Sequence, residues 1–467
     1  MNQRYKWVLV GVGLVALGGT AAGLYLGYQL VSIGAAYKGR ILCSGVFVSQ
    51  RNPQSILSAD LSGDYLSVLR HINAHVDYRS REVTTEFLGF ARRKAVYREG
   101  RGCAVVDGEL PAISPARSSE TPVSEARPRT NQWDSRDESP PEFDQARLQA
   151  ALDWAFSDPD PELPRRTRAV AIVHQGRLVA ERYAQGFTKE TPQIGWSMTK
   201  SVINALVGIL VKDGKISLNT PAPVPEWQSS GDPRHVITLE HLLRMTSGLR
   251  FNEDYSNPRA DAPYMLFGVS DMAAYAAEKP LEAEPGTRWS YSSGSTNIIA
   301  RVIRQVVAAS DHYNNFPRRA LFERIGMPSA VLETDATGTY VGSSFMYATA
   351  RDWARFGLLY LNDGVWAGQR ILPEGWVTYS RKITLLAPNQ QYAAHFWLKV
   401  PDEYRRDQNA RPLPADAFHA IGHEGQLLTI IPSRELVVVR LGLTRYRGAW
   451  DHNAFLNLVL DAILVPK

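Results

Sequence analysis

The sequence Ser197-Met198-Thr199-Lys200 lies near the middle of a 467-residue chain. If this stretch is helical, Ser197 and Lys200 lie three residues apart on one face, close enough for the amine to take the hydroxyl proton. A serine hydroxyl is a poor nucleophile at neutral pH, and a lysine can activate it once burial lowers the pKa of the amine. The four residues therefore predict a nucleophile and its proton acceptor.

The residues around this motif favour the same interpretation. An apolar run over residues 201–211 ends at Lys212-Asp213-Gly214, which is a typical helix stop, so both side chains would be held on a buried helix. By itself, S-x-x-K also occurs by chance at helix N-termini that expose the lysine. The choice between the two interpretations depends on the rest of the chain.

Two further motifs follow downstream. Trp289-Ser290-Tyr291-Ser292-Ser293-Gly294 precedes a helical run over residues 297–307 and supplies a phenol beside a hydroxyl. Ile421-Gly422-His423-Glu424-Gly425-Gln426 precedes a β pattern over residues 427–431, and its glycine lets backbone N–H groups approach a substrate oxygen. Taken singly, each has a plainer interpretation, because tyrosine is often packing and a His-Glu-Gly loop is often a turn.

The order of the three motifs resembles that of the serine β-lactamase and penicillin-binding protein superfamily. The class C-like branch is the most similar, with its esterases and 6-aminohexanoate-dimer hydrolases. The resemblance covers about residues 142–467, and secondary segments at residues 238–249, 285–287 and 348–357 agree with it.

The resemblance implies a role for each matching residue. Ser197 would be the acylated nucleophile, with Lys200 and Tyr291 as its proton-transfer partners. Ser293 stands where most β-lactamases have asparagine, and residues 423–425 stand where they have Lys-Thr-Gly. The implied oxyanion and substrate-binding residues are Gln426, Gly425, His423 and Ser293, with the N–H groups of Ser197 and Gln426 as the oxyanion donors.

Two departures from the family pattern bear on the substrate. Glu424 would place a negative charge where a β-lactam carboxylate sits, and Ser293 removes an amide donor and acceptor. We therefore expect a small-molecule ester or amide as substrate, as in the esterase and 6-aminohexanoate-dimer hydrolase branch. Two alternatives remain open: a true penicillin-binding protein or β-lactamase, and a catalytically inactive binding module of the cell envelope.

Other classes of function have little support. The sequence holds no H-E-x-x-H, C-x-x-C, Walker A or G-x-S-x-G motif, so we expect no metal and no cofactor. The net charge of +5 is small for this length and the basic residues are scattered, so we expect no nucleic-acid partner.

The N-terminus predicts a membrane anchor. Residues 7–33 carry no charge and are mostly apolar, and about 20 such residues suffice to cross a bilayer. A cleaved signal peptide is the alternative, although its apolar core is usually shorter. Arg4 and Lys6 before the span balance Lys38 and Arg40 after it, so charge leaves the orientation open.

The two cysteines, Cys43 and Cys103, both follow this span. One disulfide between them would close a small domain and require an oxidising compartment, whereas two unrelated buried thiols are the alternative. The sequences around them also look like the N-terminal region of membrane-anchored proteins in this hydrolase group. We therefore expect a single-pass protein of the cytoplasmic membrane whose catalytic domain is periplasmic or otherwise extracytoplasmic.

These observations predict four segments: an anchor at residues 1–35, a small disulfide-closed domain at 36–113, a linker at 114–142 and a hydrolase domain at 143–467. The expected fold class is α/β (α+β), with an antiparallel sheet flanked by helices and an inserted helical subdomain. Strands are predicted at residues 169–174, 177–183, 427–431 and 435–441, with helices at 144–156 and about 454–464.

Overall fold

The structure is a computed structural model that describes residues 3–106, 142–229, 231–307, 313–405 and 411–464. Within these ranges the side chains of residues 3–22, 64 and 65 are not described. The linker expected at residues 114–142 lies outside the described residues except for its last position.

A five-stranded antiparallel sheet forms the centre of the C-terminal domain, in the order β12-β13-β14-β5-β6. The turn between β5 and β6 has Gln175 and Gly176 at φ of 51° and 76°, as a two-residue hairpin with the twist of the strands requires. The predicted strands are confirmed, with bounds shifted by two residues at most. They are β5 (Thr167–His174), β6 (Arg177–Tyr183), β13 (Gln426–Ile431) and β14 (Leu436–Gly442), while the fifth strand, β12 (Phe418–Gly422), was not predicted.

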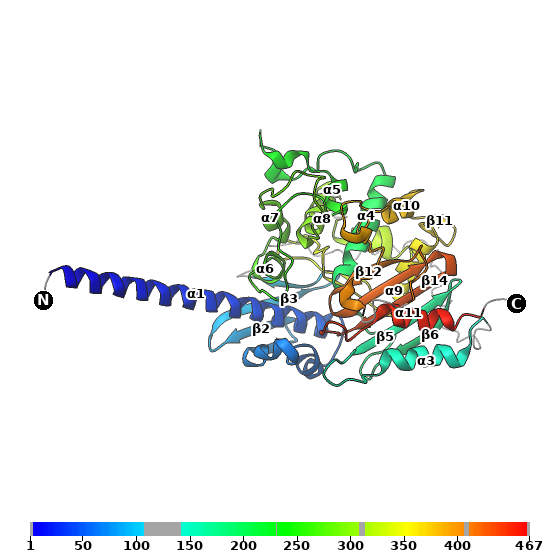
Figure 1. Cartoon of the computed structure of the whole chain (residues 1–467), viewed down its shortest axis with the longest axis horizontal. Coiled ribbons are helices and arrows are strands. Elements are labelled where there is room, and N and C mark those ends of the chain that lie inside the picture. Colours follow the sequence, from blue (N-terminus) through cyan, green and yellow to red (C-terminus); the bar gives the residue numbers. More distant parts are fainter. Residues whose placement is uncertain (1–2, 107–141, 230, 308–312, 406–410, 465–467) are drawn as a thin grey trace.

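Helices cover both faces of this sheet. Leu436 and Val438 of β14 pack with α3 (Gln145–Phe156) and α11 (His452–Asp461). Val437 and Val439, on the other face, belong to the cluster that includes α9 (Ala350–Leu361). This alternation of apolar side chains explains why β14 is buried along its whole length. Figure 1 shows α3 and α11 beside β5 and β6.

The expected helical subdomain is inserted between β6 and β12 and stands above the sheet in Figure 1. Its core is α4, whose residues from Thr199 to Leu210 are all buried. The helices are α4 (Thr199–Lys212), α5 (Leu239–Leu243), α6 (Asp261–Gly268), α7 (Met272–Ala277), α8 (Ser293–Val307) and α10 (Trp376–Arg381). The short strands are β7 (Gln193–Ile194), β8 (Val331–Leu332), β9 (Met346–Ala348), β10 (Val365–Trp366) and β11 (Gln369–Arg370).

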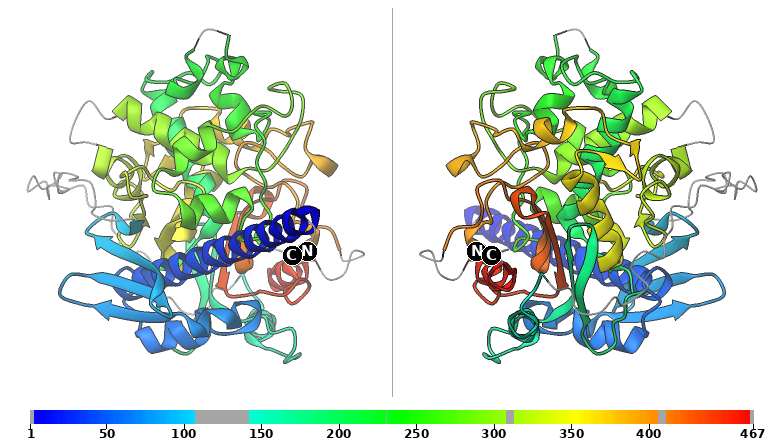
Figure 2. Two further views of the ribbon diagram at one scale, coloured as in Figure 1. Left: turned by 90° about the vertical axis from the view of Figure 1, so that its left-hand side faces the viewer. Right: turned by 90° about the vertical axis from the view of Figure 1, so that its right-hand side faces the viewer.

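The N-terminal part is a long helix laid across a four-stranded antiparallel sheet, and the two views of Figure 2 show the helix beside this sheet. The disulfide between Cys43 and Cys103 joins the helix to the last strand, which confirms the predicted pairing. The elements are α1 (Gln3–Phe47), α2 (Pro53–Ser55), η1 (Ile56–Asp60), β1 (Asn73–Asp77), β2 (Glu82–Phe87), β3 (Phe90–Arg98) and β4 (Gly102–Val106).

Helix α1 is continuous for 45 residues and so runs through the boundary that we placed at residue 35. Among the residues whose side chains the structure describes, no helix offers a run long and apolar enough to cross a membrane. The span expected at residues 7–33 is therefore not supported by the structure, and its residues 7–22 lie outside those with described side chains.

A buried ionic cluster joins the N-terminal part to the C-terminal domain. Glu333 accepts hydrogen bonds from Arg40 (3.1 Å), Ser44 Oγ (2.7 Å) and the backbone N–H of Cys103 (2.9 Å). Gly102 permits this approach, because a Cβ there would lie 2.3 Å from Glu333 Oε1. The side chains of Arg40 and Glu333 are 1% and 0% exposed, so the ion pair lies in the core that the two parts share.

Candidate active site

The turn that carries Ser197 is short and buried. It forms the 3₁₀ segment η4 (Trp196–Met198), and α4 begins two residues after the serine, slightly later than the sequence predicts. Trp196 has a φ of 46°, a conformation that costs a non-glycine residue energy and persists only where the surroundings enforce it. The surroundings do so here, because Gly195 donates to Met346 O (2.8 Å) and Thr199 Oγ1 donates to Trp196 O (2.7 Å).

Lys200 reaches back to the serine from the first turn of α4. Its Nζ donates to Ser197 Oγ (2.9 Å), Ser293 Oγ (3.1 Å) and the carbonyl of Ser343 (2.9 Å). The side chain is buried, and burial lowers the pKa of the amine to about 8, although the charge of Glu253 partly opposes this shift. A sizeable fraction of Lys200 is therefore neutral near physiological pH, as a proton acceptor must be.

Tyr291 is the second group that contacts the serine. Its phenol is hydrogen-bonded to Ser197, and Lys200 Nζ lies 4.9 Å from the centre of its ring. Burial raises the pKa of the phenol, and the charge of Glu253 raises it further. Tyr291 is therefore neutral at ordinary pH, which suits a group that passes on a proton rather than a permanent phenolate.

The third motif lies in the hairpin between β12 and β13, directly beside the serine turn. A Cβ on Gly422 would lie 2.1 Å from the carbonyl oxygen of Gly195, so the two backbones approach as closely as glycine allows. Gly422 pairs with Gln426 across the hairpin. Gln426 binds the end of β14 through its side chain, which donates to Gly442 O (2.8 Å) and accepts from Gly442 N (3.0 Å).

Our expectation for Glu424 is wrong. The residue is buried with a φ of 58°, and its carboxylate accepts from Arg445 Nε at 3.0 Å. The two side chains are 4% and 0% exposed, so a cation inside the protein neutralises the charge that we expected to face the substrate. The ring of His423, in the same loop, lies beside the serine turn: it stacks on Tyr255 at 5.4 Å and meets Trp196 edge-on at 5.6 Å.

Ser293 belongs to the lysine network rather than to an exposed substrate surface. It is fully buried, accepts from Lys200 and donates its Oγ to Glu253 Oε1, while its backbone N–H donates to Glu253 Oε2 at 3.0 Å. Burial raises the pKa of Glu253, an effect that the charge of Lys200 opposes. Gly425 is also buried, has a φ of 80° and accepts from Arg440 Nη1 at 2.8 Å through its carbonyl.

Sequence reasoning missed Glu253 and Tyr255. Both lie in the loop before α6, and the Tyr255 hydroxyl is 3.5 Å from Ser293 Oγ and 3.5 Å from Glu253 Oε1. The one available signal was an acidic residue and a tyrosine soon after the segment at residues 238–249, and that spacing alone matches no motif.

Aromatic side chains form a wall on the Tyr291 side of the site. Tyr291 lies 5.5 Å from Trp397 and 5.8 Å from Tyr392, while Trp289 lies 5.6 Å from Tyr392, measured between ring centres. Such rings offer a large apolar surface with few rotatable bonds. The arrangement therefore favours an apolar or planar group next to the reacting carbonyl.

The pKa of Lys200 predicts how activity depends on pH. If its neutral amine accepts the serine proton, kcat/KM for an ester should rise with pH and reach half of its plateau near pH 8. Tyr291 should not lower the rate within this range, because its pKa is raised. Initial rates between pH 6 and pH 10, at about unit steps, check this. A flat profile across pH 7 to 9 would argue against Lys200 as the base.

Comparisons with known proteins identify the family to which the C-terminal domain belongs. A family model described as Beta-lactamase matches residues 157–457. The 6-aminohexanoate-dimer hydrolase of Paenarthrobacter ureafaciens is 26% identical over 303 residues, which make up 60% of this chain and 75% of that protein. A Bacillus anthracis structure assigned as a 6-aminohexanoate-dimer hydrolase is 26% identical with a TM-score of 0.54, covering 67% of this chain and 80% of that one.

A family VIII carboxylesterase shares the fold at 16% identity, with a TM-score of 0.51, and covers 70% of this chain and 98% of that chain. The region that the Beta-lactamase family model matches contains the whole central sheet, the inserted helices and all three motifs. The chain belongs to the beta-lactamase family and is a serine hydrolase.

Proposed function

We propose that the protein hydrolyses an ester or amide through an acyl-enzyme on Ser197. The observation that carries this proposal is the contact of 2.9 Å between Lys200 Nζ and Ser197 Oγ, made by an amine whose pKa burial lowers to about 8. The roles that we propose for Tyr291 and for the oxyanion donors depend on this contact.

The mechanism uses the groups in turn. Lys200 takes the hydroxyl proton as Ser197 Oγ attacks the substrate carbonyl, and the backbone N–H groups of Ser197 and Gln426 stabilise the oxyanion. Tyr291 passes a proton to the leaving alcohol or amine as the carbonyl–heteroatom bond breaks, and Lys200 returns the serine proton to Tyr291. Water then attacks the acyl-enzyme, Lys200 takes a proton from the water and passes it to Ser197 Oγ as the acyl–oxygen bond breaks, and the acid leaves.

The substrate class rests on the surroundings of the serine. The partly exposed rings of Trp289, Tyr291 and Trp397, which pack on the buried ring of Tyr392, favour an acyl or leaving group with an apolar chain. Relatives named as a 6-aminohexanoate-dimer hydrolase and a carboxylesterase support an amide or an ester as the bond cleaved.

A β-lactam substrate is the second candidate. The internal pairing of Glu424 with Arg445 removes the repulsion of a substrate carboxylate that the sequence suggested. Among the described residues around the serine, we find no other group that specifically favours a substrate carboxylate. An ester or amide therefore remains our first choice of substrate.

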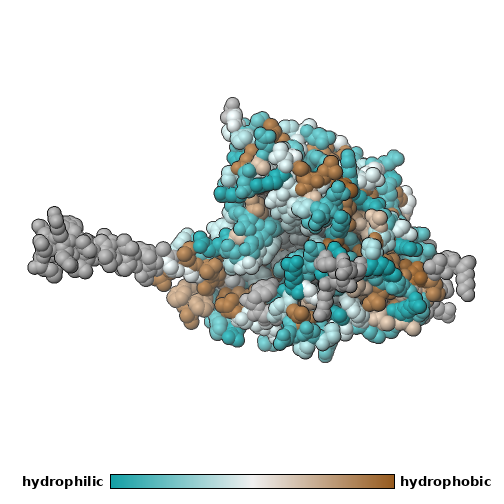
Figure 3. Space-filling model, viewed as in Figure 1, coloured by the Kyte–Doolittle hydropathy of each residue, from teal (hydrophilic) through white to brown (hydrophobic). Residues whose placement is uncertain are grey.

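For the location we propose a single membrane span at residues 7–33 with the catalytic domain outside the cytoplasm. The uncharged apolar sequence and the disulfide support this. Leu24 and Tyr25 of α1 are 71% and 61% exposed, and Figure 3 shows hydrophobic residues where α1 leaves the body.

A wash of the membranes with alkaline carbonate tests the anchor, and the full chain should stay in the membrane fraction. Recovery of the full chain in the aqueous phase would contradict the anchor.

Turnover tests the proposed function. The full chain should hydrolyse short-chain p-nitrophenyl esters, and Ser197→Ala should lose at least about 10³-fold in kcat, since removing a nucleophile leaves only binding and oxyanion stabilisation. Benzylpenicillin in the same assay separates the two candidates. Equal rates for wild type and Ser197→Ala on every substrate would contradict the proposal.

A further inference from the structure

The loop at residues 423–426 is called the third-motif loop below. We infer that the N-terminal part positions this loop, with Arg445 and Asp60 as positioning residues for the reaction. The inference rests on the proposed function for its catalytic consequence, while the contacts that carry it lie outside the Ser-Lys-Tyr cluster.

Arg445 bridges the third-motif loop and the N-terminal part. Its Nε donates to Glu424 Oε1 at 3.0 Å, its Nη2 donates to the backbone carbonyl of Asp60, and its Nη1 lies 3.4 Å from the carbonyl of Gly63. A planar guanidinium can serve several acceptors in fixed directions, which the point charge of a lysine cannot do. The side chain is 0% exposed, so the protein packs around the bridge on all sides.

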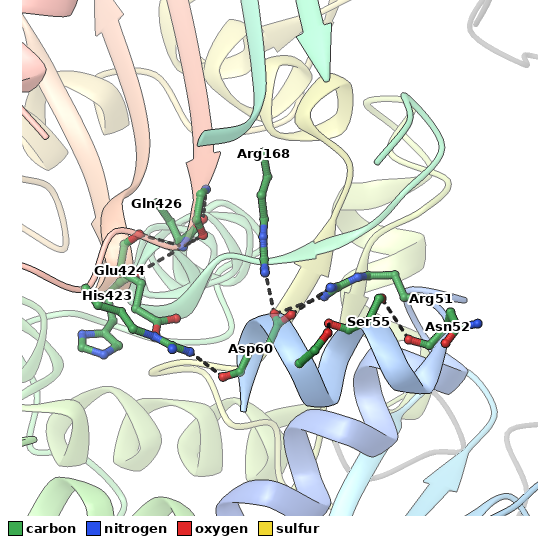
Figure 4. A network of polar contacts seen from close by, with 11 residues as sticks. Arg51, Asn52, Ser55, Asp60, Arg168, His423, Glu424 and Gln426 are labelled. Carbon is green, nitrogen blue, oxygen red and sulfur yellow. Dashed lines mark hydrogen bonds and ion pairs between the residues drawn. The ribbon is translucent and has the colours of Figure 1, made fainter. Parts of the chain in front are cut away.

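Asp60 is itself held firmly by cations from both parts of the chain. Its carboxylate accepts from Arg51 at 3.1 and 2.8 Å and from Arg168 of β5 at 2.7 Å. Burial raises the pKa of this carboxyl, but the charges and hydrogen bonds of Arg168 and Arg51 outweigh burial and lower the pKa to about 2. Asp60 with Arg51 and Arg168 is called the N-terminal clamp below. Figure 4 shows it facing the loop that carries His423, Glu424 and Gln426.

The loop needs such external support. Glu424 has a φ of 58°, a left-handed conformation that favours glycine, and Gly425 follows at 80°. The oxyanion donor that we propose, the N–H of Gln426, comes directly after these two residues. A misplacement of about 1 Å at such a site can cost about 10²-fold in rate, so small shifts of Glu424 matter for catalysis.

The third-motif loop is thus supported from two sides. Within the C-terminal domain, the backbone N–H of Thr444 donates to Glu424 O at 2.9 Å and Arg440 binds Gly425 O. From the N-terminal part, the segment from Asp60 to Gly63 supports the loop through Arg445. Loosening that segment should lower transition-state stabilisation while leaving substrate binding by the aromatic wall unchanged.

The test uses the full chain with three variants. Asp60→Asn removes the carboxylate charge that Arg51 and Arg168 hold. Arg445→Lys keeps a cation for Glu424 but loses the forked bridge. Arg98→Gln is the matched control, because Arg98 also joins the two parts, by bonds to Thr334 Oγ1 (2.7 Å) and Asp335 O (2.6 Å), at a different place.

Two readouts are measured: kcat and KM for ester hydrolysis, and amide hydrogen exchange of peptides that cover residues 420–428. Asp60→Asn and Arg445→Lys should each lower kcat by about tenfold, within the cost of mispositioning an oxyanion donor. KM should change by less than about twofold, and exchange in the loop should speed up. Arg98→Gln should change neither.

Wild-type kcat and wild-type exchange in the loop of both test variants would overturn the inference. If Asp60→Asn does not fold, Arg445→Lys decides alone, since it leaves the N-terminal clamp intact. If the wild type itself hydrolyses no ester, the proposed function fails, and hydrogen exchange still decides whether residues 60–63 hold the loop.

Discussion

Replacing Lys200 by alanine is expected to lower kcat for ester hydrolysis by about 10²–10⁴-fold, the range that one general acid–base group contributes. The Nζ atom of Lys200 contacts Ser197 Oγ, and its lowered pKa makes the neutral amine available as a proton acceptor. KM should change less than kcat, because the amine hydrogen-bonds to the serine and Ser293, while its contact with the aromatic wall is a 4.9 Å approach to the ring of Tyr291. Steady-state rates with p-nitrophenyl esters measure the effect.

Lys212→Ala provides the control for this variant. Lys212 lies on the same helix but at its far end, where its Nζ binds the carbonyl of Arg370. Its removal should leave kcat unchanged. The role of Lys200 would be contradicted by a Lys200→Ala enzyme that retains more than about a tenth of wild-type kcat at pH 8, given the usual contribution of such a group.

Replacing Glu333 by alanine should destabilise the protein by about 3–5 kcal/mol, the usual cost of removing one partner of a buried ion pair. Arg40 would keep its charge inside the core without the carboxylate that hydrogen-bonds to it, and the hydroxyl of Ser44 and the N–H of Cys103 would each lose an acceptor. Urea unfolding, followed by tryptophan fluorescence, measures the change in the free energy of unfolding.

The double variant Arg40→Met/Glu333→Leu is the matched comparison for Glu333. Replacing both charges by apolar side chains often costs little, so this protein should be more stable than Glu333→Ala. A loss below about 1 kcal/mol in Glu333→Ala would show that the pair does not link the two parts.

Much of the fold could be predicted because its signals are local. The hairpin at Gln175-Gly176, the apolar run of β14 and the S-x-x-K helix each depend on residues that are close in sequence. The disulfide could be predicted because the chain has only two cysteines and both follow the expected span, where an oxidising compartment favours their pairing.

The features that were missed depend on contacts between distant residues. Glu253 approaches Lys200 and Ser293 only because the inserted helices fold over α4. Glu424 looked like an exposed charge because its partner, Arg445, comes 21 residues later and approaches only when β14 completes the sheet. Its left-handed φ is likewise invisible in the sequence.

The extent of α1 was also hidden. The helix continues through the expected end of the anchor, and beyond that point small residues let other elements pack against it. Gly45 is one example, since a Cβ there would lie 2.6 Å from Ile56 of η1. Composition separates the apolar sequence from the more polar residues after it, but it does not show where a continuous helix passes into a folded domain.

The central claim is that Ser197 becomes acylated. Mass spectrometry of the intact full chain, quenched in acid within seconds of adding a p-nitrophenyl ester, tests it most directly, followed by peptide mapping. The account predicts a mass gain of one acyl group on the peptide that contains Ser197, and no gain in Ser197→Ala. Ester turnover with no acyl adduct at Ser197 in the wild type, or an equal adduct in Ser197→Ala, would contradict it.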